Sequence, residues 1–205
     1  LATEAGSALL RNRIPAHDCE VLSNATQMGL VCIGKTHMSE LAFSGLVLNP
    51  IMQSPPCVND PDAVSGGSSS GAAASVAFGL ASAGIGSDTG GSVRIPSAWN
   101  DLVGLKTTAG RVSLKGVVPL CESFDTVGPL CRSVEDAAQL LAALEGMRAM
   151  DLTGVSLAGL RFAVLDTIAF EDIRDQPAAA FEDAVQKLTK AGAHVTRIRF
   201  DDLNE

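Results

Sequence analysis

Three segments of the chain space their apolar residues with the period of an amphipathic helix. Residues 17–29 are the first of them. Residues 133–146 are the second, with Ser133 as a capable N-cap and Gly146 at the C-terminal end. Residues 177–193 are the third, with a proline in the first turn. The pattern therefore predicts a helix in each segment.

Short apolar runs between these helices predict strands. Residues 30–37 read as a short buried strand, residues 84–88 as a strand that enters a turn, and residues 102–108 as another strand. Residues 159–166 and 194–200 also read as strands, and they flank the third helix. Strand, helix and strand in that order form a β-α-β unit, which indicates a parallel or mixed sheet.

The other segments lack a clear amphipathic period. Residues 44–64 are rich in proline and predict a loop. Residues 71–83 have helical character and are almost all small, so we expect an interior helix that lies close to neighbouring backbone. A short helix is expected at residues 92–100, and residues 109–132 are expected to be irregular.

Length and charge narrow the class of protein. The chain has 205 residues, of which 46% are hydrophobic, so it can bury the core of one or two domains. Its formal net charge of −8 argues against binding to nucleic acid or to an anionic membrane surface, because both depend on lysine and arginine. We find no apolar run as long as a membrane span and no signal peptide.

The cysteines indicate a reducing compartment. There are five of them, widely spaced and without a C-x-x-C pair. That pattern is typical of free thiols in a cytoplasmic protein and not of a disulfide framework or a zinc site. No histidine or cysteine pair has the spacing of metal ligands, so we expect no metal.

The segment 65-SGGSSSGAAASVAFGLASAGIGSDTGGSVRIPS-97 carries the candidate chemistry. A flexible linker is one interpretation, but the cluster runs directly into the small-residue helix and has nothing to link. A phosphate-binding loop is a second, but the pattern G-x-x-x-x-G-K-[ST] is absent. The dinucleotide fingerprint also fails, because position 89 is a threonine.

Nucleophilic catalysis by a serine is the third interpretation. In 88-DTGGS-92, Gly90 and Gly91 permit turn conformations that are closed to other residues. The amides of residues 89–92 can then converge as an oxyanion hole, in which each donor contributes about 3–4 kcal/mol at the transition state. Ser92 ends that turn. The G-x-S-x-G elbow of α/β-hydrolases is absent, so this would be a different serine chemistry.

Residues 66–97 resemble the signature of the amidase signature family, the Ser-cisSer-Lys amidases. The match comprises GGSSSG, a run of small residues and GSDTGGSVRIPS, with two serines 24 positions apart. Flanking segments extend the resemblance over nearly the whole chain: 33-IGKTHMSELAFSG-45, 103-VGLKTTAGRVSLKGVVP-119 and 123-SFDTVGPLCRSVEDAAQLL-141.

The resemblance implies an α/β fold, with a central mixed β-sheet covered by helices on both faces, which is incomplete in this chain. Residues 1–205 would form a single partial amidase signature domain. Its signature core would span about residues 30–145, and a β-α-β continuation would span about residues 159–200.

The resemblance also implies roles for the serines. Ser92 would be the acylating nucleophile. Ser68 would follow a cis peptide bond after Gly67 and relay a proton between Ser92 and a lysine. Ser69 would support this network through hydrogen bonds.

The residues around the nucleophile receive roles in the same way. Thr89, Gly90, Gly91 and the amide of Ser92 would line the oxyanion hole. Arg94 would lie near the site, and two interpretations of it stay open. It binds substrate, or it forms a structural ion pair with Asp88, which is at least as well supported.

The catalytic lysine is expected upstream of residue 1. Lys35 is a tempting candidate, but the family has a separate GKT landmark at that place and carries its lysine earlier, in a strand reading G-[VI]-K-D. We therefore interpret the chain as an internal fragment of a longer amidase that has no activity alone. His17, His37 and His194 are alternative bases, each expected at a surface or a segment edge.

The resemblance predicts an amidase that hydrolyses a carbon–nitrogen amide bond through a serine acyl-enzyme, without a cofactor. Its partner would be a small-molecule amide, and it would form a homodimer or bind amidotransferase partner subunits. The alternative is the glutaminase subunit of a tRNA-dependent amidotransferase, which more commonly reads KPTYG where this chain has 106-KTTAGR-111. A non-catalytic or scaffold member is the second alternative.

Overall fold

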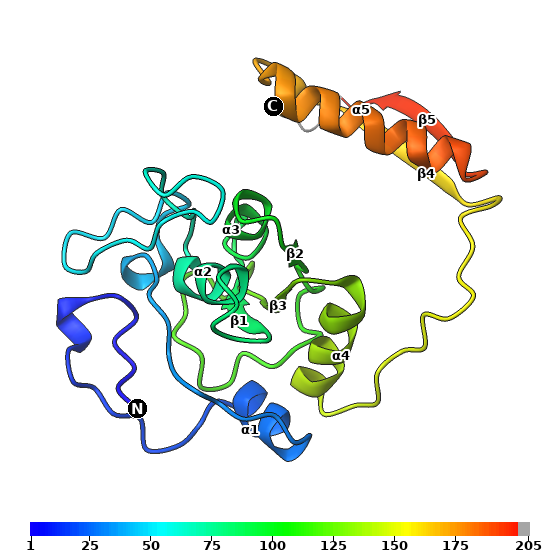
Figure 1. Cartoon of the computed structure of the whole chain (residues 1–205). Helices are drawn as coiled ribbons and strands as arrows, with labels where there is room; N and C mark the ends of the chain where they lie inside the picture. Colours follow the sequence, from blue (N-terminus) through cyan, green and yellow to red (C-terminus); the bar gives the residue numbers. More distant parts are fainter. Residues whose placement is uncertain (201–205) are drawn as a thin grey trace. The chain divides into compact units, whose positions relative to one another are not determined.

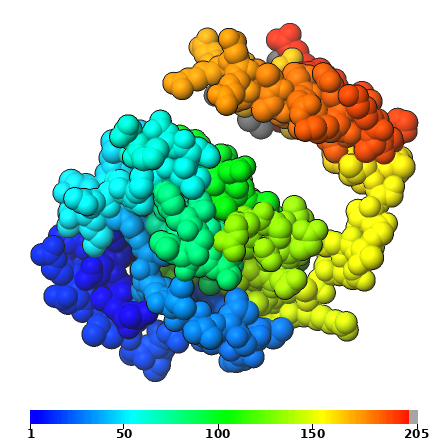
Figure 2. Space-filling model, viewed as in Figure 1, coloured from blue at the N-terminus to red at the C-terminus, as the bar shows by residue number. Residues whose placement is uncertain are grey.

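The computed structural model describes residues 1–200 (Figure 1). The chain divides into two compact units, Leu1–Asp151 and Leu152–Glu205. The first unit contains the glycine- and serine-rich signature, and its side chains pack closely against one another (Figure 2).

A three-stranded antiparallel sheet lies at the centre of the first unit, in the order β1-β3-β2. Strand β1 is Gly84–Ser87, β2 is Val103–Gly104 and β3 is Val127–Cys131. In the register, Gly84 pairs with Leu130 and Val103 pairs with Cys131. All five residues of β3 are buried, so this strand forms the middle of the core.

Strand β3 corrects the expectation that residues 109–132 are irregular. Gly128 and Pro129 are poor strand formers, which hides the element in the sequence. In the sheet, Pro129 needs no partner for its missing N–H, and its carbonyl accepts a hydrogen bond from the amide of Leu105 at 3.1 Å. Burial between two strands therefore outweighs the low propensity.

Four α-helices surround this sheet (Figure 1). Helix α2, Ser70–Ala77, contacts β1 and β3, and α3, Arg94–Trp99, contacts β2. Helix α1, Glu20–Gln27, packs on α4, Val134–Glu145. The helices expected at 17–29, 71–83, 92–100 and 133–146 are thus all confirmed with shorter bounds.

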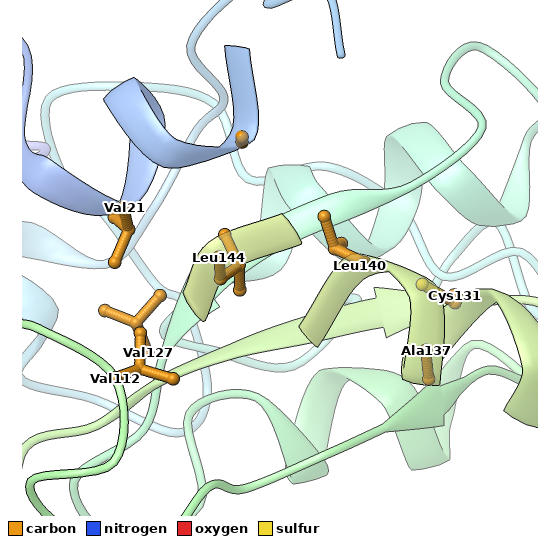
Figure 3. Close-up of a cluster of buried hydrophobic side chains, with 8 residues drawn as sticks. Val21, Val112, Val127, Cys131, Ala137, Leu140 and Leu144 are labelled. Atoms are coloured by element: carbon orange, nitrogen blue, oxygen red, sulfur yellow. The ribbon is translucent and has the colours of Figure 1, made fainter. Parts of the chain in front are cut away.

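Helix α4 also packs on β3 and closes a hydrophobic cluster (Figure 3). In Figure 3, Val21 of α1 points toward Val127 and Val112, and Leu144 of α4 lies beside them. The eight buried members are Val21, Ala25, Val112, Val127, Cys131, Ala137, Leu140 and Leu144.

The caps expected for α4 are confirmed. The hydroxyl of Ser133 accepts a hydrogen bond from the amide of Asp136 at 3.0 Å. Gly146 ends the helix in the left-handed conformation, with φ of 67°.

The prediction of a strand at residues 30–37 is wrong. No strand lies along this segment in the described part of the chain, and the side chains of Val31 and Ile33 are exposed. An apolar run alone does not make a strand, because a strand needs a neighbour to receive its backbone hydrogen bonds. The proline-rich segment 44–64 is a loop, as predicted, with one isolated bridge between Pro56 and Val64.

The second unit is a β-α-β unit, as predicted. Strands β4, Arg161–Asp166, and β5, His194–Arg199, pair in parallel, with Arg161 opposite His194. Helix α5, Asp175–Lys190, connects them and contacts β5. Of the helices described in residues 1–200, none has the length and apolar character needed to cross a membrane.

Gly128 gives a test of the central sheet. A Cβ atom at this position would collide with the carbonyl oxygen of Leu105 on the neighbouring segment. We expect Gly128→Ala to lower the free energy of unfolding by about 1–3 kcal/mol, the usual cost of overpacking a core. Urea unfolding measures this change. Gly34→Ala is the matched control, because nothing lies within 4 Å of that position, and an equal loss in both variants would contradict the packing of β3.

Candidate active site

The turn 88–92 connects β1 to α3 and is built around the carboxylate of Asp88. This side chain is completely buried. Its oxygens accept hydrogen bonds from the backbone amides of Gly91 at 2.9 Å, Val93 at 3.1 Å and Arg94 at 3.3 Å. Gly91 has φ of 134°, which a residue with a side chain rarely adopts. The D-T-G-G-S sequence therefore folds by wrapping its own backbone around its first residue.

Arg94 forms the ion pair with Asp88 that was one of its two interpretations. Its Nε and Nη2 each lie 3.0 Å from a carboxylate oxygen of Asp88, and its side chain is 51% exposed. Burial alone would raise the pKa of Asp88, but the hydrogen bonds from Arg94 and the backbone amides outweigh it and hold that pKa far below its usual range. Asp88 is thus a fixed negative charge beneath the turn.

The amides of the turn have different partners. The Gly91 amide is occupied by Asp88, so Gly91 contributes its backbone conformation. In the described residues, the amides of Thr89, Gly90 and Ser92 have no hydrogen-bond partner. These three N–H groups are the ones available to stabilise a negative charge beside Ser92.

Ser68 lies in the interior next to this turn. It is fully buried, and the peptide bond between Gly67 and Ser68 is cis, as the resemblance implied. The Ser68 carbonyl accepts a hydrogen bond from the Ser39 amide at 3.1 Å. Its hydroxyl has no hydrogen-bond partner among residues 1–200. A buried hydroxyl without a partner is unusual, and a role in catalysis is one explanation for it.

Ser69 connects the two serine segments. Its amide donates a hydrogen bond to the carbonyl of Ser92 at 3.2 Å, and its hydroxyl donates one to the carbonyl of Ser87 at 3.3 Å. Ser92 itself is 8% exposed. The structure therefore brings together Ser68, Ser69 and Ser92, which the sequence separates by a helix and a strand.

The candidate bases lie in different surroundings. Lys35 is exposed, and its ammonium contacts the Thr3 hydroxyl and the Leu1 carbonyl. His17 and His194 are exposed, as expected. His37 is half-buried, with Nδ1 2.9 Å from the Ser70 hydroxyl, so it lies against the signature helix. Burial lowers the pKa of His37.

Sequence reasoning missed two charged residues beneath the turn. Lys106 follows β2, and its ammonium is surrounded by backbone carbonyls of the turn and of residue 124. Asp125 precedes β3 and accepts a hydrogen bond from the hydroxyl of Thr89. In the sequence, the only indication that either residue belongs to the site was its position in a segment that flanks the signature.

Asp125 also closes the loop 120–125. Its carboxylate accepts hydrogen bonds from the amides of Leu120 at 2.8 Å and Cys121 at 3.0 Å. Burial raises the pKa of Asp125, but the hydrogen bonds from Thr89 and these amides bring it below its usual range. Across residues 1–200, no three histidine, cysteine, aspartate or glutamate side chains gather in a way that would hold a metal ion.

Comparisons with known proteins identify the family. The family model of the amidases matches residues 1–205. This chain belongs to the amidase signature family. It is 37% identical to the glutamyl-tRNA(Gln) amidotransferase A subunit of Ligilactobacillus salivarius, over 97% of this chain and 43% of that protein. It is 45% identical to the 2-amino-5-chloromuconic acid deaminase of Comamonas testosteroni, over 83% of this chain and 38% of that protein.

A solved structure confirms the expected α/β fold class. The crystal structure of the glutamyl-tRNA(Gln) amidotransferase A subunit of Thermotoga maritima matches with a TM-score of 0.89 and 32% identity. The match covers 97% of this chain and 47% of that one. The chain thus spans less than half the length of the relatives it matches.

Proposed function

We propose that the protein containing this chain hydrolyses an amide through an acyl-enzyme on Ser92. The observation that carries the proposal is the turn 88–92. It places Ser92 next to amides that have no partner in the described residues, in a turn that the buried carboxylate of Asp88 holds through the amides of Gly91 and Val93. Such fixed donors stabilise the charge that develops on a carbonyl oxygen during acyl transfer.

In the proposed first half-reaction, the oxygen of Ser92 bonds to the carbonyl carbon of the amide. Its proton passes to the Ser68 hydroxyl, whose own proton passes to a lysine amine. The amides of Thr89, Gly90 and Ser92 hold the resulting oxyanion. The carbon–nitrogen bond then breaks, and the nitrogen takes a proton from the relay and leaves as ammonia or an amine.

The second half-reaction returns the enzyme to its starting state. Water adds to the acyl carbon and gives a proton to the relay. The bond between this carbon and the Ser92 oxygen breaks, and the Ser92 oxygen regains its proton. The products are a carboxylic acid and the amine.

We propose that the lysine comes from a segment upstream of residue 1. None of the lysines in residues 1–200 contacts the Ser68 hydroxyl. Lys35, Lys115, Lys187 and Lys190 are exposed, and a lysine accepts a proton near neutral pH only when burial lowers its pKa.

A small-molecule amide is the substrate class we propose, and the partner is a second copy of the chain or amidotransferase subunits. The glutaminase subunit of a tRNA-dependent amidotransferase is the second candidate, favoured by the similarity to two such subunits. We rank it second because such subunits more commonly read KPTYG where this chain has 106-KTTAGR-111. Ammonia release from glutamine and from a panel of simple amides, with and without amidotransferase partner subunits, separates the two. Release from none of them would support the non-catalytic alternative.

Ser68 gives the test of the relay. In the complete protein, Ser68→Ala should lower kcat by about 10²–10⁴-fold, the usual contribution of a proton-transfer group. The melting temperature should stay nearly unchanged, because the hydroxyl makes no hydrogen bond with the described residues. Kinetics and thermal unfolding, with the exposed Ser82→Ala as control, check both expectations. A parent-like kcat in Ser68→Ala would remove Ser68 from the mechanism.

A further inference from the structure

Lys106 places its ammonium beneath the oxyanion turn. The Nζ atom lies 2.6 Å from the carbonyl oxygen of Asp88, 3.3 Å from that of Thr89 and 3.1 Å from that of Phe124. It is also 3.3 Å from the Thr126 hydroxyl and 3.3 Å from the carboxylate of Asp88. All five contacts are with oxygen atoms that accept hydrogen bonds. The side chain is 26% exposed, so most of it is packed against the protein.

The carbonyls of Asp88 and Thr89 determine the directions of two amides. A trans peptide group is planar, and its C=O and N–H point in opposite directions. The carbonyl of Asp88 shares its peptide group with the amide of Thr89. The carbonyl of Thr89 shares its group with the amide of Gly90. A cation that holds both carbonyls therefore turns both amides away from itself.

Those two amides have no hydrogen-bond partner among the described residues, in contrast to the Gly91 amide, which Asp88 occupies. A positive charge at the carbonyl end of a peptide group also draws electron density from its N–H, which strengthens that N–H as a donor. Lys106 thus acts on the donors through orientation and through polarisation.

The surroundings of Thr89 limit its movement further. The Thr89 hydroxyl donates a hydrogen bond to Asp125, and the charge of Lys106 attracts the same carboxylate. The Asp88 carbonyl also accepts hydrogen bonds from the Thr126 hydroxyl at 2.9 Å and from the Thr126 amide at 3.1 Å. The peptide groups of the turn are thus held by a cation from one segment outside the signature, and by a carboxylate and a hydroxyl from a second.

We propose that Lys106 is a positioning residue for the amide hydrolysis proposed above. It acts through the peptide groups 88–89 and 89–90, whose N–H groups receive the oxyanion. It is not the base of the relay, because it makes no contact with the Ser68 hydroxyl. This inference rests on the proposed function, and it assigns a role to a residue outside the serine signature.

The test compares Lys106→Met with the parent and with Lys115→Met in the complete protein. Lys115 is an exposed lysine whose ammonium makes no hydrogen bond among residues 1–200, so it controls for the loss of one charge. We expect Lys106→Met to lower kcat by about 10²–10³-fold, as the loss of one oxyanion donor does, with KM within threefold of the parent. Lys115→Met should match the parent.

Two further readouts separate positioning from a merely structural role. The rate at which a fluorophosphonate modifies Ser92 should fall in parallel with kcat, because that reaction also builds charge on an oxygen at the turn. The pH at which the rate is half-maximal should stay where it is in the parent, because the base is a different group. Lys106→Gln keeps two donors without the charge, so its kcat should lie between those of Lys106→Met and the parent.

The results that overturn the inference are specific. One is a kcat within threefold of the parent in Lys106→Met, or in Lys106→Gln if the methionine variant does not fold. Another is a raised KM with an unchanged kcat in the same variant. A change in the pH at which the rate is half-maximal would indicate that Lys106 is the base of the relay. If the parent itself neither hydrolyses an amide nor reacts with the probe, the proposed function fails. Hydrogen exchange of the Gly91 and Val93 amides, which Asp88 holds in the same turn, then decides whether Lys106 positions the turn. Exchange at least tenfold faster in Lys106→Met supports this role, and equal exchange refutes it.

Discussion

Replacing Ser92 with alanine in the complete protein is expected to lower kcat for amide hydrolysis by about 10⁴–10⁶-fold, the range seen when a serine nucleophile is removed. The variant loses the atom that bonds to the acyl carbon, and no other serine lies at the end of the turn. The fold should persist, because the one hydrogen bond from Ser69 uses the backbone carbonyl of Ser92. Steady-state ammonia release and circular dichroism measure the two expectations.

Ser82→Ala is the matched control for this prediction. Ser82 is exposed, and its hydroxyl makes no hydrogen bond with any described residue, so the variant should keep the parent kcat. Turnover within tenfold of the parent in Ser92→Ala would show that another group attacks the substrate.

The second large effect is expected from Asp88→Asn, which removes the charge beneath the turn. Asparagine replaces one of the two carboxylate oxygens with an N–H₂ donor, and each oxygen now accepts hydrogen bonds from Arg94 and from the amide of Gly91 or Val93. We expect the free energy of unfolding to fall by about 2–4 kcal/mol, below the full cost of breaking a buried pair because Arg94 is half-exposed. Since the turn that carries the free amides of Thr89, Gly90 and Ser92 loses its anchor, kcat should also fall by about 10²-fold or more.

The pH dependence of stability gives an independent check on Asp88. Its pKa in the folded protein lies below that of an unfolded aspartate, near 3.9. The folded state is therefore stabilised by the charged carboxylate above about pH 4, and this contribution is lost as the pH falls toward the folded pKa. The difference in stability between the parent and Asp88→Asn should thus be largest near neutral pH and shrink as the pH falls below about 4.

Urea unfolding at several pH values measures this difference. Asp62→Asn is the control, because Asp62 is exposed and its carboxylate makes no hydrogen bond in the described part of the chain. A stability difference for Asp88→Asn that is the same at pH 7 and pH 3 would contradict the role of the carboxylate in the turn.

Elements with a strong local signal could be predicted from the sequence. Helix α4 has a clear apolar face, a capping serine and a terminal glycine, and each of these acts within a few residues. The β-α-β unit likewise shows two apolar runs around one amphipathic helix. Strand β3 escaped prediction because its stability comes from burial between β1 and β2, which no local pattern records.

Some residues of the candidate site could likewise be predicted from the sequence, and others could not. Ser68 and Ser92 were found because the signature is long and contiguous in the sequence. Lys106 and Asp125 were missed because their roles depend on contacts with Asp88 and Thr89, which lie in the turn after β1. The Arg94 pair with Asp88 was one of the two interpretations that the sequence left open, since both residues lie within the signature.

The central claim is that Ser92 is the nucleophile, and mapping the residue that a fluorophosphonate modifies tests it most directly. The complete protein is treated with the probe and digested, and the modified peptide is sequenced by mass spectrometry. The account predicts a single phosphonyl group on Ser92, and none in the Ser92→Ala variant. A phosphonyl group on Ser68 or on another serine, or one that persists in Ser92→Ala, would contradict it.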